Sequence, residues 1–308
     1  MTDETIHTLI RDHRDRRRPI LQRRLDYFEG RTRSGLPRRL TDGPREIVLE
    51  NDIAWRLHTM VDLILGRPVA IRAEGPRRDE IEAALDEVFE RSGGIAFLQD
   101  AATLAHVHGR VPILIRHDDS PLGVRLDLVD PRHAIPLDDG GLIIDVVRTD
   151  PGRPPVETIE VIEPSRHRRF EAGTLVHDGP GLLGGLSPVV LLRNLSDPLS
   201  HDGLSDVEPL IGLQDELNTR LSDRANRVTM QAFRMLLAKG IEGPESLPVE
   251  PGTVWRTWNP DADVRAIGGD APAPSEERHI QDIREALDKV SAIPPLAGGV
   301  VQGRIGNL

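Results

Sequence analysis

The hydrophobic pattern of this chain changes period along its length, and the order of the changes predicts the fold class. Apolar residues at helical spacing cover residues 3–28, 51–65, 78–91 and 97–108. Pro19 is expected to kink or break the first of these helices. Short strand-like runs follow at 111–117, 124–130, 142–148, 156–163 and 166–173. Turn residues separate these runs as in an antiparallel meander, so we expect an α+β fold, with further short strands at 69–73 and within 181–194.

The longest unbroken helical pattern begins near Ser205. Ser205 and Glu208 have the spacing of a capping box, and Pro209 lies in the first turn, where a missing N–H is tolerated. The apolar stripe consists of Leu210, Leu213, Leu217, Leu221, Ala225, Val228, Ala232 and Met235. Because the stripe keeps its register, we expect the helix to reach about Leu237 and a length of roughly 50 Å.

The other faces of this helix are polar. Glu216 and Asp223 each precede an arginine by four positions, Arg220 and Arg227, which is the favoured orientation for ion pairs within a helix. A further face carries small hydrogen-bonding residues, which are Asp215, Asn218, Thr219, Ser222 and Asn226. We expect the apolar stripe to meet another helix and the polar faces to meet solvent.

Beyond this helix the pattern predicts a small β appendage and a returning helix. Strand-like runs at 253–258 and 262–267 lie among Gly and Pro residues, in a segment too short to have its own core. A helix is expected over 275–292, with an apolar face formed by Ile280, Ile283, Leu287 and Val290. The order of long helix, appendage and returning helix describes a hairpin with the appendage at its tip.

Composition narrows the functional classes. None of the 308 residues is cysteine, which excludes disulfides and thiolate metal sites. The 50 acidic residues outnumber the 39 basic ones and give a net charge of -11, so the surface as a whole does not favour binding of phosphate. No apolar run has membrane-spanning length, and charged residues occupy the N-terminal positions where a secretory signal needs apolar ones. We therefore expect no association with a membrane.

The densest group of potential metal ligands is His106, His108, His117, Asp118 and Asp119. The expected helix end would point His106 and His108 about 200° apart, which argues against a shared ion. The sequence has no G-x-S-x-G elbow and no phosphate-binding loop. We therefore expect no catalytic residues, no metal and no cofactor, and the alternative of a metal-dependent hydrolase built on residues 106–119 remains open.

Several stretches together identify a family resemblance. They are DYFEG (26–30), NDIAWRLHTMVDLILGRPVAI (51–71), AHVHGRVPILIR (105–116), VDPRHAIPLDDG (129–140), SPVVLLRN (187–194) and GLSDVEPLIGLQDELNTRLSDRAN (203–226). The sequence resembles the portal proteins of tailed bacteriophages of the siphophage type, and those of similar prophages and gene-transfer particles. The last stretch is the most specific, because its order of cap, apolar stripe and Asn/Ser/Asp face is similar to that of the family's first stem helix.

The resemblance implies a division of the chain into portal regions. Residues 1–200 would form the wing, 201–237 the first stem helix, 238–268 the clip and 269–293 the second stem helix. Residues 294–308 would begin the tunnel-loop region. Family members continue into a further helix and a crown, whereas this sequence ends at Leu308. We expect either a truncated product or a chain with further residues beyond it.

The resemblance also implies a role and partners. Portal subunits form a ring, usually of twelve, at one capsid vertex of the virion, and the ring is assembled in the cytoplasm of the bacterial host. Double-stranded DNA passes through its channel without sequence specificity during packaging and ejection. The clip docks the large terminase and later the head-completion adaptor, and the ring meets the scaffold and the major capsid protein. A different head-assembly module, such as an adaptor or a scaffold-binding protein, is the other structural alternative.

Candidate residues follow from this assignment. Contacts between subunits in the stem are expected at Leu210, Leu217, Leu221, Asp223, Arg227 and Val228. Docking candidates in the clip are Glu242, Glu245, Trp255 and Trp258. Candidates for the DNA channel are Gln302 and Arg304.

Overall fold

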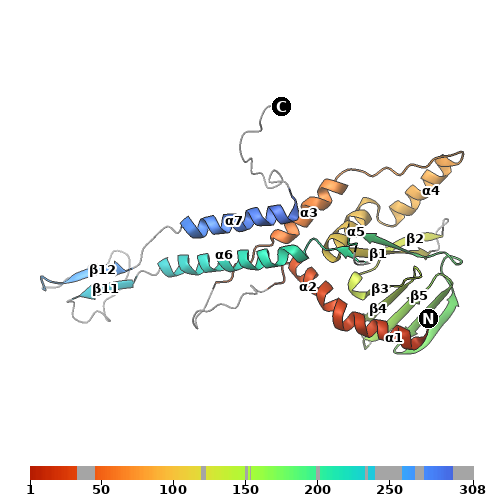
Figure 1. The fold of residues 1–308 in the computed structure, drawn as a ribbon, viewed down its shortest axis with the longest axis horizontal. Helices are drawn as coiled ribbons and strands as arrows, with labels where there is room; N and C mark the ends of the chain where they lie inside the picture. Colours follow the sequence, from red (N-terminus) through yellow and green to blue (C-terminus); the bar gives the residue numbers. More distant parts are fainter. Residues whose placement is uncertain are drawn as a thin grey trace. The chain divides into compact units, whose positions relative to one another are not determined.

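The computed structural model describes residues 1–32, 46–118, 123–149, 152, 154–198, 202–232, 235–239, 259–267 and 274–293 (Figure 1). The chain divides into two compact units. Unit 1 comprises Met1–Thr32, Asn51–Gln214 and Leu287–Leu308, and unit 2 comprises Arg33–Glu50 and Asp215–Ala286. Helices and antiparallel sheets are both present, which confirms the α+β class. Among the described helices, none is long and apolar enough to cross a membrane.

The N-terminal helical run contains a π-helical segment where a proline break was expected. Helix α1 (Asp3–Asp12) continues through a π-helical segment (His13–Arg17) into α2 (Arg18–Phe28). Pro19 lies in the first turn of α2. Because proline has no N–H to donate to the carbonyl four residues earlier, the turn before it widens without ending the helix.

Three further helices have bounds close to those expected from the sequence. They are α3 (Asp52–Leu65), α4 (Arg78–Arg91) and α5 (Gly94–His108). The strand expected at 69–73 is wrong, because these residues form no strand. The backbone N–H of Ala73 instead donates to the carboxylate of Glu82, with 2.9 Å between N and Oε1.

The expected meander is divided between two antiparallel sheets. The small sheet has the order β2-β1-β8 and consists of β1 (Arg110–His117), β2 (Val124–Leu128) and β8 (Val189–Arg193). The large sheet has the order β3-β4-β5-β6-β7 and consists of β3 (Ala134–Pro136), β4 (Leu142–Arg148), β5 (Val156–Ile162), β6 (Arg166–Glu171) and β7 (Thr174–Pro180). A 3₁₀ turn at Pro131–His133 leads the chain from the first sheet to the second. Strands β3 and β7 were not expected from the sequence.

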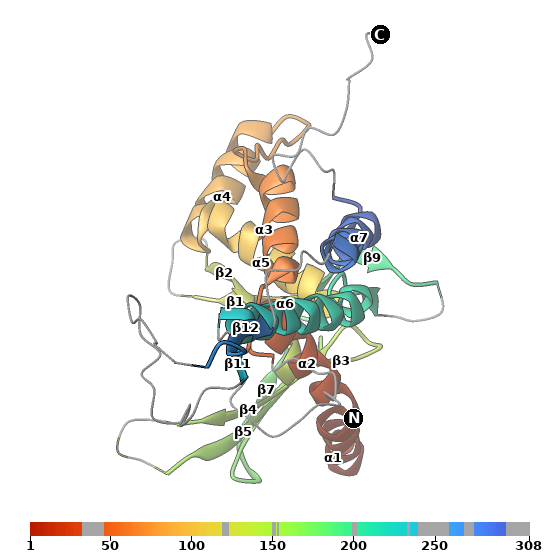
Figure 2. The same ribbon diagram turned by 90° about the vertical axis from the view of Figure 1, so that its left-hand side faces the viewer.

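The core of unit 1 is layered around β4. Leu142 and Ile144 pack with Leu114 and Val129, between the two sheets. Ile143, which points to the opposite face of the strand, packs against α1 through a second cluster that contains Ile6 and Ile10. Helix α5 covers the small sheet, where its Ala101 and Ala105 pack against Val111 of β1. Strand β4 therefore has buried residues on both faces. Helix α1 lies beside the large sheet (Figure 2).

A charged group joins the two sheets. Arg116 of β1 donates two hydrogen bonds to Glu160 of β5, at 2.9 and 2.8 Å, and His167 of β6 lies 2.8 Å from the same carboxylate. Burial alone would raise the pKa of Glu160, but the hydrogen bonds from Arg116 and His167 outweigh burial and hold the pKa at about 2. Glu160 is therefore ionised at neutral pH and links the sheets.

The last part of the chain contains the long helix and its return. Short strands β9 (Leu195–Ser196) and β10 (Gly203–Leu204) pair with each other and precede a 3₁₀ turn at Glu208–Leu210. Helix α6 (Ile211–Ala232), strands β11 (Met235–Lys239) and β12 (Asp263–Ile267) and helix α7 (Pro274–Ser291) follow. Strands β11 and β12 pair antiparallel with each other. The expected order of helix, β appendage and helix is confirmed, although 253–258, the first strand expected in the appendage, lies outside the described residues.

Candidate assembly surface on the long helix

The start of α6 is held by contacts other than the expected capping box. Ser205 Oγ accepts a hydrogen bond from Val207 N at 3.2 Å and donates to Val107 O at 2.6 Å. The carboxylate of Glu208 accepts a hydrogen bond from Arg24 at 2.8 Å. The capping box is therefore wrong, because the Ser205 hydroxyl binds Val207 N and Val107 O and the Glu208 carboxylate binds Arg24, where a capping box would join each side chain to the other residue's backbone N–H.

The end of α6 also differs from the expectation. The helix ends at Ala232, and Met235–Lys239 forms strand β11. Its 22 residues give a length of about 33 Å instead of 50 Å. The apolar run from Met235 to Ala238 fits a strand as well as a helix, and antiparallel pairing with β12 satisfies its backbone as a strand.

The small polar face of α6 binds the backbone of another segment. Residues 46–50, which we call the docked segment, donate alternate backbone N–H groups to α6 side chains. Glu46 N donates to Asn226 Oδ1 at 2.9 Å, and Asn226 Nδ2 donates back to Glu46 O at 3.1 Å. Val48 N donates to Ser222 Oγ at 3.0 Å, and Glu50 N donates to Asn218 Oδ1 at 3.0 Å. Three α6 side chains therefore act as the hydrogen-bonding partners that a neighbouring strand would otherwise supply.

The geometry of this contact follows from the two backbone periods. The α6 residues are four positions apart, which corresponds to a rise of about 6.0 Å. The docked segment uses every second residue, and in an extended chain two residues span about 6.6 Å. The similar intervals let each polar side chain reach one N–H group. In unit 1, Asp52 N makes the same kind of contact with Gln214 Oε1 at 3.1 Å.

The small polar face of α6 is therefore buried, whereas the sequence predicts that it is exposed. Asn218 and Ser222 are buried, at 2% and 0% exposed, whereas Val228 of the apolar stripe is 56% exposed. Of the other stem candidates, Leu210 and Leu217 are fully buried and Leu221 is partly buried. The expectation that the small polar face meets solvent is wrong, because the docked segment covers it. The alternate residues Ile47 and Leu49 of that segment are exposed instead.

The charged stem candidates have partners within unit 2. Arg220 donates to Glu216 at 2.7 Å, which confirms one expected pair, and to Asp223 at 3.4 Å. Arg227 does not pair with Asp223 as expected and instead forms an ion pair with Glu276 of α7. Arg284 of α7 donates two hydrogen bonds to the carboxylate of Glu50, at 3.0 and 2.8 Å. Helix α6, the docked segment and α7 are therefore tied together inside unit 2.

Six other candidates lie outside the described residues. Glu242, Glu245, Trp255 and Trp258 of the expected clip belong to this group, as do Gln302 and Arg304 of the expected DNA channel.

The histidine-rich segment does not converge on one point. His106 Nδ1 lies 2.6 Å from Asp206, and His117 Nδ1 lies 2.7 Å from Gly123 O. His108 is 3% exposed and neither ring nitrogen has a hydrogen-bond partner among the described residues. Burial lowers the pKa of His108 to about 4, so its ring is neutral at pH 7. Within the described ranges, no group of three or more His, Asp or Glu side chains could hold a metal ion, and Asp119 lies outside them.

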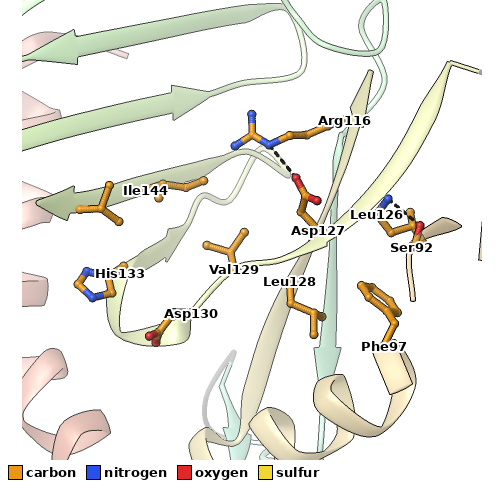
Figure 3. Close-up of a pocket in the computed structure, with 11 residues that line it drawn as sticks. Ser92, Phe97, Arg116, Leu126, Asp127, Leu128, Val129, Asp130, His133 and Ile144 are labelled. Carbon is orange, nitrogen blue, oxygen red and sulfur yellow. Dashed lines mark hydrogen bonds and ion pairs between the residues drawn. The ribbon is translucent and has the colours of Figure 1, made fainter. Parts of the chain in front are cut away.

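A pocket of about 490 Å³ lies along β2 and β4 of unit 1 (Figure 3). Its apolar lining includes Val129 and Ile144, and its charged residues are Arg116, Asp127, Asp130 and His133. Arg116 binds Asp127 at 3.2 Å as well as Glu160, and Asp130 binds Arg132. His133 Nδ1 lies 2.7 Å from the carbonyl oxygen of Asp145. Each of these charged side chains is thus engaged by other groups of the protein.

The docked segment and the contribution of Gln214 are not expected from the sequence. A signal for both exists in the spacing of carboxamide and hydroxyl residues at Gln214, Asn218, Ser222 and Asn226, four positions apart on one helix. Carboxamide and hydroxyl groups that are buried need hydrogen-bond partners, and an extended backbone alongside the helix can supply them.

Comparison with known proteins gives a likeness of fold. No family model and no curated protein matches this chain. A chain of the virion of a native gene transfer agent (GTA) particle matches with a TM-score of 0.52 at 11% identity, over 82% of this chain and 68% of its own. A chain from the neck of an empty GTA particle computed with C6 symmetry gives 0.53 and 14%, over 84% and 70%. A chain from the neck of a native GTA particle computed with C12 symmetry gives 0.51 and 12%, over 83% and 68%.

Proposed function

We propose that this chain is a portal subunit, which forms a ring at one vertex of a phage-like capsid and surrounds a channel for double-stranded DNA. The observation that carries the proposal is the hairpin of α6 and α7 with the β11–β12 ribbon between them, in a fold similar to that of chains in GTA virions and necks. A ring is further supported by the C12 symmetry of one of these neck structures.

The regions of the chain take portal roles in this proposal. Residues 1–200 form the wing, α6 and α7 form the stem, and the segment between them forms the clip. The clip begins at Met235 rather than at 238, because β11 pairs with β12. It docks the large terminase during packaging and the head-completion adaptor afterwards, while the wing region meets the scaffold and the major capsid protein.

The proposed role is structural and requires no catalysis. DNA must pass through the channel without adhering to it, and tight binding of DNA depends on neutralising its phosphates with basic residues. The excess of 50 acidic over 39 basic residues is compatible with weak, sequence-independent contact. The proposed location is the portal vertex of the virion.

The direct test is mass photometry and negative-stain imaging of the purified chain at micromolar concentration. Twelve copies of a 34.1 kDa chain give a particle of about 410 kDa with a central hole. A monomer at every concentration up to about 100 μM contradicts the proposal, because portal rings are large assemblies with extensive interfaces. A smaller ring, or binding to capsid protein without a ring, favours a different head-assembly module.

A further inference from the structure

The two larger sheets of unit 1 have four edge strands, and three of these carry features that hinder pairing with another chain. Strand β7 has an irregular register with β6, and its Asp178 is charged and binds Arg166. Strand β2 carries Arg125 and Asp127, and β3 has only three residues, the last of them Pro136. Charges, irregular pairing, proline and short length are the usual protection of a free sheet edge.

Strand β8 has none of this protection. It reads VVLLR, has a regular register with β1 and contains one charged residue, Arg193, at its end. Val190 and Leu192 are 52% and 37% exposed. A free edge with exposed apolar residues favours pairing with another strand, so β8 is the edge of unit 1 at which a partner is expected.

Two residues of β8 direct their backbone groups away from β1. At the ends of the strand, the N–H of Asn194 and the C=O of Pro188 bind the backbone on the β1 side, at 2.9 and 2.8 Å. Backbone direction alternates along a strand, so Val189, Leu191 and Arg193 face the outer edge. Val189 N already donates to a serine hydroxyl at 3.3 Å. In the part of the chain that the structure describes, the N–H and C=O of Leu191 and Arg193 have no partner.

The docked segment of unit 2 has an open edge of the same length. Its amides at positions 46, 48 and 50 donate to α6. The backbone groups of Ile47 and Leu49 therefore point away from α6, and none of them has a partner within the described ranges. The two side chains are 61% and 46% exposed. The segment thus resembles an edge strand whose inner neighbour is a helix.

We propose that the docked segment of one copy pairs with β8 of the next copy, as a fourth strand of the small sheet. Antiparallel pairing of Ile47 with Arg193 and of Leu49 with Leu191 joins all four open N–H groups to the four open C=O groups. Residue 48 then lies opposite residue 192, so the apolar side chains of a valine and a leucine meet on one face of the sheet.

A second copy is the partner because this chain supplies both open edges, each with two outward residues and exposed apolar side chains. A row of backbone N–H and C=O groups binds an extended polypeptide, which excludes nucleic acid as the partner. The paired edges are different surfaces, so the contact is head-to-tail, and such contacts generate rings when the rotation closes. The inference therefore rests on the proposed ring.

Disulfide cross-linking tests the contact, because the chain has no cysteine of its own. Val48 and Leu192 are opposite each other at a position without backbone hydrogen bonds, where Cα atoms are about 4.5 Å apart and a disulfide fits. One variant carries Val48→Cys and another Leu192→Cys. After assembly and oxidation, each variant alone should remain monomeric on a non-reducing gel, whereas the two variants mixed before assembly should form covalent dimers.

Two further cysteine experiments complete the test. A chain with both Val48→Cys and Leu192→Cys should give a ladder of covalent oligomers, because every copy then links to the next. The control mixes Val48→Cys with Val176→Cys, since Val176 is equally exposed but lies on the protected edge strand β7. This mixture should form at least about tenfold less dimer, because the two thiols lie too far apart to bond.

Hydrogen exchange on the unmodified chain gives a second measurement that needs no substitution. In the unassembled chain the amides of Ile47, Leu49, Leu191 and Arg193 should exchange fast, because they have no acceptor in the described structure. Assembly should slow all four by about tenfold or more, since each amide gains a hydrogen bond. This measurement decides the question if a cysteine variant fails to fold or to assemble.

Four results overturn the inference. If assembled rings lack either the dimer from the mixture or the slower exchange at the four amides, the contact is wrong and the portal proposal stands. A disulfide that closes within one chain, seen as a faster-migrating monomer of the double variant, means that the edges do not pair between copies. A control mixture that forms as much dimer removes the specificity that the contact requires. If the unmodified chain forms no ring, the proposed function fails, and this contact fails with it.

Discussion

Replacing Ser222 by alanine tests the contact between α6 and the docked segment. In the structure the amides of Glu46, Val48 and Glu50 donate to α6 side chains. The amides of Ile47 and Leu49 have no hydrogen-bond acceptor among the described residues. Hydrogen exchange should therefore alternate along this segment, slow at 46, 48 and 50 and fast at 47 and 49. Ser222→Ala removes the acceptor of Val48 only.

The Ser222 hydroxyl also lies 2.7 Å from Asn218 O and 3.3 Å from Val48 O, and its single proton serves the nearer Asn218 O. The expected size of the effect on the docked segment therefore follows from the one hydrogen bond that Val48 N loses. A typical intramolecular hydrogen bond contributes about 1 kcal/mol net. If the segment opens locally, this loss accelerates exchange at Val48 about fivefold, and Glu46 and Glu50 follow to the extent that the segment opens as one piece. Alanine has the higher helix propensity, by about 0.5 kcal/mol, so α6 itself should not be weakened.

Thr219→Ala is the matched control, measured by the same site-resolved hydrogen exchange. Thr219 is also buried on α6, but its hydroxyl donates to Asp215 O at 2.8 Å in the preceding turn of the same helix. This variant should leave exchange at Val48 unchanged. Equal acceleration in both variants, or equally fast exchange at Ile47 and Val48 in the unmodified chain, would refute the hydrogen bonds between the docked segment and α6.

Two further predictions concern pH and the apolar stripe. Because the folded-state pKa of His108 is about 4 and its ordinary value is 6.5, the unfolded chain gains a proton that the folded chain does not, and stability is lost as pH falls from 6.5 to 4. Protonation of His108 should lower the free energy of unfolding by about 3 kcal/mol over this range, which urea unfolding can measure. His108→Leu should make the free energy of unfolding depend less steeply on pH. An equally steep dependence in the variant would contradict the prediction. Leu217→Asp places a carboxylate at a fully buried position, so unit 2 should lose roughly 3 kcal/mol or more and ring assembly should fail while unit 1 keeps its circular dichroism. Normal rings from that variant would mean that the stripe packs differently.

The sequence was most informative where periodicity and stop signals coincide. Helix α4 has the expected bounds, and α7 begins and ends one residue before its expected limits. Alternation identified strands but not their partners, because it does not distinguish one sheet from two. The turn at Pro131–His133, which separates the sheets, resembles any other short connection in the sequence. Similarly, the apolar run from Met235 to Ala238 fits both the helical and the strand period, and its pairing with β12 makes it a strand.

The candidate surface was harder to predict than the helix that carries it. Asn218 and Ser222 were recognised as small and hydrogen-bonding, and solvent was the simplest partner for them. Their actual partner is the backbone of residues that precede them by more than 160 positions, at separations of 168 and 174. The docked segment contributes backbone N–H groups, which every residue except proline has, so its own side chains form no pattern that would predict the contact.

The contact between α6 and the docked segment also has a limited length. Each step on the helix covers about 6.0 Å and each step on the extended chain about 6.6 Å, so the two scales drift apart by about 0.6 Å per contact. Three contacts accumulate a difference of about 1 Å, which side-chain rotation absorbs, whereas six would accumulate about 3 Å and break the last hydrogen bonds. If the docked segment slipped by one residue along α6, the N–H groups that now face the α6 side chains would point away from them. The difference in rise thus limits the contact to a few hydrogen bonds in one register, between two parts of the chain that are far apart in sequence.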